Sequence, residues 1–238
     1  RRMSVAQSAT REPQAKAGTR GPKGASQEPQ PFLHPDDALA SPAIQELAKI
    51  AIEEFRPRGR AYDENCSMPK ENIYALFERG WLSTTVPKEF GGKGSNLDTD
   101  DPATYLQALR VIARGCSGTA HCYGLQSHGA WLISTIGTPF QIEKYIKPMM
   151  QRPFLLSSVG SEAKRRHMYM MNTQAKRVDG GWLINGEKNY ATNGPMMDFA
   201  IIFAAIEGVK DYNDNHLMLI IEPGMKGVSV DNTWYRPN

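Results

Sequence analysis

The sequence lacks any apolar run long enough to cross a membrane. Its longest candidate, residues 199–206, has the length of a strand, whereas a membrane helix needs about 20 apolar residues. Cysteine is scarce as well. The three cysteines (Cys66, Cys116 and Cys122) form no CxxC pair and leave an odd thiol, which favours a reducing compartment. We therefore expect no membrane contact and a cytoplasmic location, with the mitochondrial matrix as the alternative.

The sequence also lacks a cluster of metal-ligating side chains. Its five histidines are scattered, and a site built on His121 and His128 would miss the other ligands that zinc requires. Cys122 beside His121 is interpreted as a small buried thiol rather than a nucleophile or a metal ligand. We expect no metal site.

Acidic and large apolar residues are rare at the N-terminus. Residues 1–31 carry a net charge of +4, whereas the remainder carries −1, so the basic pI of 8.7 belongs to this segment and predicts no nucleic-acid binding. Its Gly, Pro, Ser and Gln content predicts a disordered tail. Its arginines leave a mitochondrial presequence open, although prolines and glycines oppose the required helix.

The chain from residue 32 to residue 152 has helical periodicity. Ser41 is a predicted N-cap before Pro42, and an apolar stripe at helical spacing then runs to Phe55, with Pro57 and Gly59 predicted to end the helix. Further helices are predicted to begin near residues 69, 102, 117 and 139. We interpret residues 32–152 as an all-α N-terminal domain.

Residues 153–238 follow a different pattern, in which short β-type runs alternate with turn residues. The predicted strands are residues 154–159, 173–178, 182–184, 189–192, 199–206, 216–221 and 228–230. Short strands between turns are typical of an antiparallel sheet or barrel. The predicted fold class is α+β, with the β domain incomplete at residue 238.

Five motifs in a fixed order suggest a family. They are residues 80–82 (GWL), 86–94 (VPKEFGGKG), 137–141 (GTPFQ), 178–188 (VDGGWLINGEK) and 190–194 (YATNG). In order and spacing they resemble the acyl-CoA dehydrogenase superfamily over residues 42–238. That resemblance implies a helical domain, a β domain and a C-terminal four-helix bundle, with FAD held between them. The bundle is expected beyond residue 238.

The resemblance also implies which residues meet the flavin. Residues 156–163 (LSSVGSEA) correspond to the family's TEPxxGSD segment when Ser161 is aligned with the Thr and one loop residue is omitted. We expect Ser158, Val159 and Ser161 to contact FAD there, with a serine-rich strand end that binds no ligand as the alternative. Tyr190 stands where the family has a Trp against the flavin, and Tyr190, Ala191 and Thr192 are the second expected contact. Ordinary strand residues would also explain this second segment.

Residues 164–167 (KRRH) depart from the family, which has small residues and a Ser-Asp there. A cationic loop at the acyl-CoA entrance can attract phosphates, so Arg166 and His167 are predicted to bind substrate. An exposed charge run is the alternative. The methionines at positions 168, 170 and 171 are interpreted as filling the core between the domains, with an acyl pocket as the other reading.

The resemblance implies α,β-dehydrogenation of an acyl-CoA thioester, as in fatty acid metabolism, with hydride transfer to flavin N5 and an electron-transferring flavoprotein or flavin reductase as partner. It also implies a homodimer or homotetramer. No catalytic base is assigned, because Glu187 and Glu222 stand near turns without a supporting cluster; the base is expected beyond residue 238. A flavin-dependent monooxygenase of the same fold and a truncated non-catalytic subunit remain the alternatives.

Overall fold

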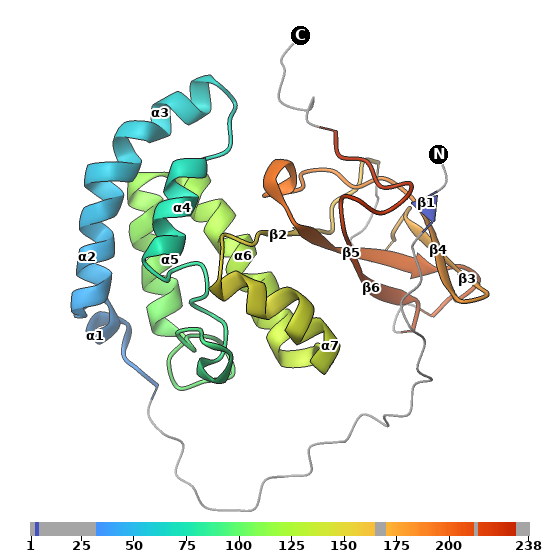
Figure 1. Cartoon of the computed structure of the whole chain (residues 1–238), viewed down its shortest axis with the longest axis horizontal. Coiled ribbons are helices and arrows are strands. Elements are labelled where there is room, and N and C mark those ends of the chain that lie inside the picture. The colour runs from blue at the N-terminus through green and yellow to red at the C-terminus, as the bar shows by residue number, and fades with distance from the viewer. Residues whose placement is uncertain (1–2, 5–31, 165–169, 212–213, 232–238) are drawn as a thin grey trace, which may run out of the picture.

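A computed structural model describes residues 3–4, 32–164, 170–211 and 214–231, and it places a helical domain beside a sheet of six strands (Figure 1). The predicted disordered tail lies outside the described residues except for β1 (Met3–Ser4), which pairs with β4. In the described parts of the chain, no helix combines the length and apolar character that a membrane span needs.

The helical domain contains the helices that the apolar spacing predicts, and a short one before them. They are α1 (Pro35–Ala40), α2 (Pro42–Ile50), α3 (Arg56–Glu64), α4 (Lys70–Glu78), α5 (Ala103–Gly115), α6 (Ser117–Ile136) and α7 (Pro139–Gln141). Ser41 caps α2 as predicted, since its hydroxyl accepts the N–H of Ile44. A π-helical turn (Ile142–Ile146) and a 3-10 turn (Lys147–Met150) extend α7 toward the sheet.

Pro57 and Gly59 do not end the first long helix, so that prediction was wrong. A π-helical turn (Ala51–Phe55) joins α2 to α3, and the N–H of Arg56 donates to the carbonyl of Ala51. Because this turn shifts the hydrogen-bond pattern, Pro57 falls in the first turn of α3, where its missing N–H costs little. The helix therefore continues to Glu64.

The sheet contains β2 (Leu156–Val159), β3 (Gln174–Val178), β4 (Gly181–Asn185), β5 (Phe199–Ile206) and β6 (His216–Ile221) besides β1. The expected antiparallel sheet is in fact mixed: β3–β4 and β5–β6 are antiparallel, whereas β5 is parallel to both β2 and β3. Parallel neighbours need a long connection, which residues 160–198 provide between β2 and β5.

Two predicted strands are absent from the described residues. Residues 189–192 form a loop, because Tyr190 and Asn193 have φ of 57° and 67°, outside the extended region. Residues 228–230 are also irregular and follow the turn at Gly227, whose φ is 86°. Turn geometry therefore outweighed β-propensity at both places.

The two domains share a hydrophobic core. Leu156, Phe199 and Ile201 from the sheet pack in one cluster with Ala130 and Ile133 of α6 and with Tyr145 and Ile146 of the following π turn. The approach of α6 to β2 is close: a Cβ added at Gly129 would lie 2.3 Å from Leu156 Cδ1. This packing fixes β2 against α6, and the candidate site forms on the loop that follows β2.

Candidate functional site

The loop after β2 and the loop after β4 lie against each other. The backbone N–H of Asn189 donates to the carbonyl of Ser161 over 2.9 Å, joining residues that are 28 positions apart in the sequence. Ser161 belongs to the first segment that the family resemblance assigns to the flavin, and Asn189 immediately precedes the second. The structure therefore brings the two predicted segments together at one edge of the sheet.

A buried ion pair holds these two loops. Lys188 Nζ lies 2.6 Å from Glu162 Oε1, and their side chains are 10% and 1% exposed. Glu162 also accepts the backbone N–H groups of Asn172 and Thr173. Burial raises the pKa of Glu162, but the hydrogen bonds from Lys188 and the backbone outweigh it and lower the pKa to about 2. These partners favour the ionised form of Glu162, which links the two loops.

Asn193 anchors the β4–β5 loop to both domains. It is buried, and its side-chain amide donates to the carbonyl of Cys122 on α6 and to that of Leu156 on β2. Its φ of 67° suits an asparagine better than most residues. At the end of the loop, Asp198 accepts from the backbone N–H of Leu155 and from Arg152. These bonds fix the segment that carries residues 190–192.

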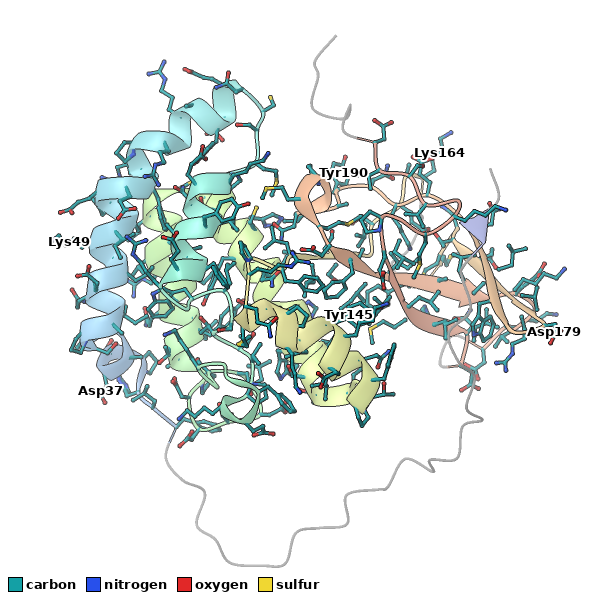
Figure 2. The ribbon with its side chains drawn as sticks, in the orientation of Figure 1. Asp37, Lys49, Tyr145, Lys164, Asp179 and Tyr190 are labelled. Carbon is teal, nitrogen blue, oxygen red and sulfur yellow. The ribbon has the colours of Figure 1, made fainter. Side chains whose placement is uncertain are left out.

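Tyr190 and Thr192 lie on the outer side of this anchored loop. Tyr190 is 74% exposed and is labelled in Figure 2 on the loop between β4 and β5. A bulky residue with φ of 57° is strained, and strain of this kind concentrates at functional sites. The Thr192 hydroxyl lies 2.9 Å from Nε2 of His121 on α6. The loop therefore presents an aromatic ring and a hydroxyl beside the helical domain.

The other predicted contacts differ in what they can offer a ligand. Ser158 is half-buried on β2, and Ser161 is exposed after it. Val159 is only 4% exposed and packs in the sheet core with half-buried Ala191, so both can reach a ligand mainly through their backbones. The predicted substrate residues Arg166 and His167 lie outside the described residues.

A second polar cluster was missed in the sequence. Glu222, which follows β6, accepts hydrogen bonds from Lys144 Nζ and from the Tyr145 hydroxyl, the latter over 2.8 Å. The assessment that Glu222 lacks a supporting cluster was therefore wrong. Burial raises the pKa of Tyr145, and the bond to Glu222 raises it further. Burial also raises the pKa of Glu222, but the bonds from Lys144 and Tyr145 outweigh this and lower that pKa. The adjacent Lys144 and Tyr145 were the only hint of this cluster in the sequence. Their contact with Glu222 is visible only in the folded structure.

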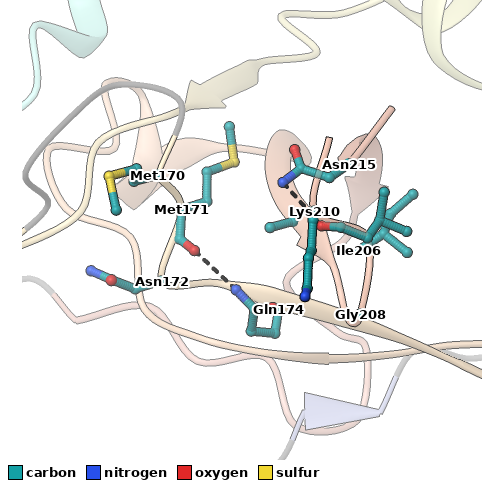
Figure 3. A pocket seen from close by; sticks show the side chains of 10 residues that line it. Met170, Met171, Asn172, Gln174, Ile206, Gly208, Lys210 and Asn215 are labelled. Atoms are coloured by element: carbon teal, nitrogen blue, oxygen red, sulfur yellow. Dashed lines mark hydrogen bonds between the residues drawn. The ribbon is translucent and has the colours of Figure 1, made fainter. Parts of the chain in front are cut away.

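The sequence suggested that Met170 and Met171 fill the core between the domains. The structure places them elsewhere. They line an open pocket of about 360 Å³ where β3 begins and β5 ends, with Asn215, Lys210 and Gln174 on its other sides (Figure 3). Met170 is 47% exposed, and Met168 lies outside the described residues. Within the ranges that the structure describes, no three His, Cys, Asp or Glu side chains gather as metal ligands would.

Two models of known protein families match this chain. The helical part, residues 43–152, matches the family model "Acyl-CoA dehydrogenase, N-terminal domain", and residues 159–237 match "Acyl-CoA dehydrogenase, middle domain". The helical domain and the mixed sheet thus correspond to the N-terminal and middle domains of this class of protein. The chain belongs to the acyl-CoA dehydrogenase family, as its sequence motifs predicted.

Individual relatives agree with this assignment. Benzylmalonyl-CoA dehydrogenase of Aromatoleum aromaticum is 28% identical over 191 residues, covering 79% of this chain and 48% of that protein. The mitochondrial 2-methylacyl-CoA dehydrogenase of Solanum tuberosum is 30% identical over 191 residues, covering 78% of this chain and 45% of that protein. The structure of butyryl-CoA dehydrogenase from Megasphaera elsdenii is 25% identical with a TM-score of 0.66, covering 77% of this chain and 49% of that one. The chain spans about half the length of the curated relatives it matches.

Proposed function

We propose that the loops after β2 and β4 form one side of a flavin site, and that the full-length protein is an FAD-dependent oxidoreductase that dehydrogenates an acyl-CoA thioester. The observation that carries the proposal is the bond from Asn189 to Ser161, because it joins the two segments that the family resemblance assigns to FAD. Membership in the acyl-CoA dehydrogenase family supports the reaction class.

The side chains present at the edge fit a flavin, which has a polar side with hydrogen-bonding atoms and an apolar aromatic side. Ser161 is exposed and Ser158 and Thr192 are half-buried, and their hydroxyls can serve the polar side. The exposed ring of Tyr190 offers a flat apolar face for the aromatic side. Hydroxyls and an aromatic ring held on two fixed loops are suited to a planar cofactor of mixed polarity.

The chain's own residues prepare this face before any ligand binds. Glu162 and Lys188 fix the first loop and Asn193 fixes the second, so little ordering entropy remains to be lost on binding. A bound flavin would accept the hydride that leaves the acyl chain. Hydroxyl and N–H donors at its polar edge stabilise negative charge that develops during reduction. The base that removes the α-proton is not assigned to any residue of this chain.

The proposal is tested by adding acyl-CoA esters of different chain length to the full-length protein, reconstituted with FAD under anaerobic conditions. Bleaching of the oxidised flavin band by any ester is the expected result, and the ester that bleaches it fastest identifies the substrate class. A bound flavin that no ester bleaches, but that consumes oxygen once a reductase has reduced it, contradicts the proposal and supports a monooxygenase. The absence of any flavin binding favours a non-catalytic subunit.

A further inference from the structure

His121 joins the helical domain to the loop that carries Thr192. Its Nε2 lies 2.9 Å from Thr192 Oγ1, across 71 residues of sequence. His121 is exposed in the second turn of α6 and lies next to Cys122, whose carbonyl binds the Asn193 side chain. The sequence motifs assign no role to this histidine, and the sequence offers too few further ligands for it to bind a metal.

The fold does not depend on this bond to hold the loop. Asn193, the next residue after Thr192, already fixes the loop through two buried hydrogen bonds to α6 and β2. The bond to His121 is exposed, and exposed hydrogen bonds contribute little to stability because water competes for both groups. Its effect is therefore on the Thr192 hydroxyl itself.

A threonine hydroxyl has one proton to donate and lone pairs with which to accept. When a neighbour donates to its oxygen, the proton remains available for another partner and its direction is restricted. A histidine that is protonated on Nε2, in its neutral or its charged form, is such a donor. The contact between His121 and Thr192 can thus keep the hydroxyl proton free and aimed away from α6.

We propose that His121 is a positioning residue for the flavin site: it donates from Nε2 to Thr192 Oγ1, so that the Thr192 proton is held ready for a hydrogen bond to the cofactor. This inference rests on the proposed flavin function. It predicts that His121 and Thr192 act on the cofactor as one unit, so that removing either has the same effect as removing both.

The test uses the full-length protein with FAD and compares His121→Leu, Thr192→Val and the double variant. We expect His121→Leu and Thr192→Val each to weaken FAD binding by about threefold to tenfold, the value of one ordinary hydrogen bond. The double variant should bind FAD no more weakly than either single variant. The midpoint potential of the bound flavin should fall in all three, because a donor to the reduced cofactor is lost.

Two further variants separate this role from a structural one. His121→Gln keeps a side-chain N–H that can reach Thr192, so it should restore FAD affinity and midpoint potential toward the wild-type values. His128→Leu is the matched control, since His128 is also exposed on α6 but its ring lies 6.2 Å from that of Trp131, tilted by 45°. It should change neither quantity.

The inference is overturned if His121→Leu leaves both FAD affinity and midpoint potential unchanged in a protein that binds FAD. It is also overturned if His121→Leu and Thr192→Val are additive in the double variant. A wild-type protein that binds no FAD overturns the proposed function, and this inference with it. The affinity of wild-type protein for FAD therefore distinguishes the two failures.

Discussion

Lys188 Nζ lies 2.6 Å from Glu162 Oε1, in a pair that connects the loop after β2 with the loop after β4. Both side chains are buried, and the carboxylate receives two backbone N–H groups besides. A buried charge of this kind persists only with its partners in place. The geometry of the candidate flavin face therefore depends on an ion pair that does not itself lie among the predicted contact residues.

Replacing Lys188 by methionine should destabilise the protein strongly. The change leaves Glu162 buried without its countercharge, and loss of one partner of a buried pair costs about 3 kcal/mol or more. Urea unfolding followed by circular dichroism measures the loss. The double variant Glu162→Gln/Lys188→Met should recover part of it, because no unpaired charge then remains.

The matched control for Lys188→Met is Arg60→Ala. Arg60 pairs with Glu64 over 2.7 Å in α3, but these side chains are 87% and 60% exposed. The free energy of unfolding should change by no more than about 0.5 kcal/mol. Similar losses at the buried and the exposed pair would refute the view that Lys188 organises the site.

Acid should remove the contribution of Glu162 to stability. Its pKa is lowered from 4.5 to about 2 in the folded chain, so folding favours the ionised form. The resulting stability is complete above pH 4.5 and is lost as the pH falls toward about 2. We therefore expect the stability advantage of the wild type over Glu162→Gln to shrink across this range in pH-dependent urea unfolding. An advantage that stays constant would show that the carboxylate is not selectively stabilised.

Asn193 should be difficult to replace for two separable reasons. Asn193→Gly removes two buried hydrogen bonds but tolerates the φ of 67°, whereas Asn193→Ala removes the bonds and also strains the backbone. The alanine variant should be less stable than the glycine variant by about 1 kcal/mol. Thermal unfolding compares them. Equal stability would mean that the backbone at this position relaxes freely.

Tyr190 should show a conflict between stability and binding. Tyr190→Gly relieves the strain of a φ of 57°, a gain of about 1 kcal/mol that the entropy of glycine in the unfolded chain partly offsets. The unliganded protein should be at least as stable as the wild type by urea unfolding, while FAD affinity, measured by flavin fluorescence, falls with loss of the ring. Tyr190→Phe keeps the ring and should bind FAD like the wild type. Unchanged affinity in the glycine variant would remove Tyr190 from the site.

Much of the fold could be predicted from the sequence, because local signals and tertiary packing agree there. The Ser41 cap, the apolar face of α2 and the strand at residues 199–206 all appear where the pattern places them. Pro57 shows the limit of such reasoning. The π-helical turn at Ala51–Phe55 accommodates the proline, and no residue pattern in the sequence predicts that turn.

The family motifs predict the flavin contacts, and these stay a prediction. The hydrogen bonds and ion pairs that connect the two loops could not be predicted from the motifs. Glu162 and Lys188 are 26 positions apart, and Glu222 lies 78 positions from Lys144. Charged residues of this kind are ordinarily solvated on the surface, so sequence gives no reason to pair them. The same holds for the mixed sheet, since parallel pairing of β2 with β5 depends on where the long connection returns.

The most direct test of the account is a crystal structure of the full-length protein with FAD bound. We expect the polar side of the flavin to contact Ser158, Ser161 and Thr192 and its aromatic side to contact Tyr190, with the pair of Glu162 and Lys188 intact. A flavin bound elsewhere, with these two loops in contact only with solvent or protein, would contradict the account.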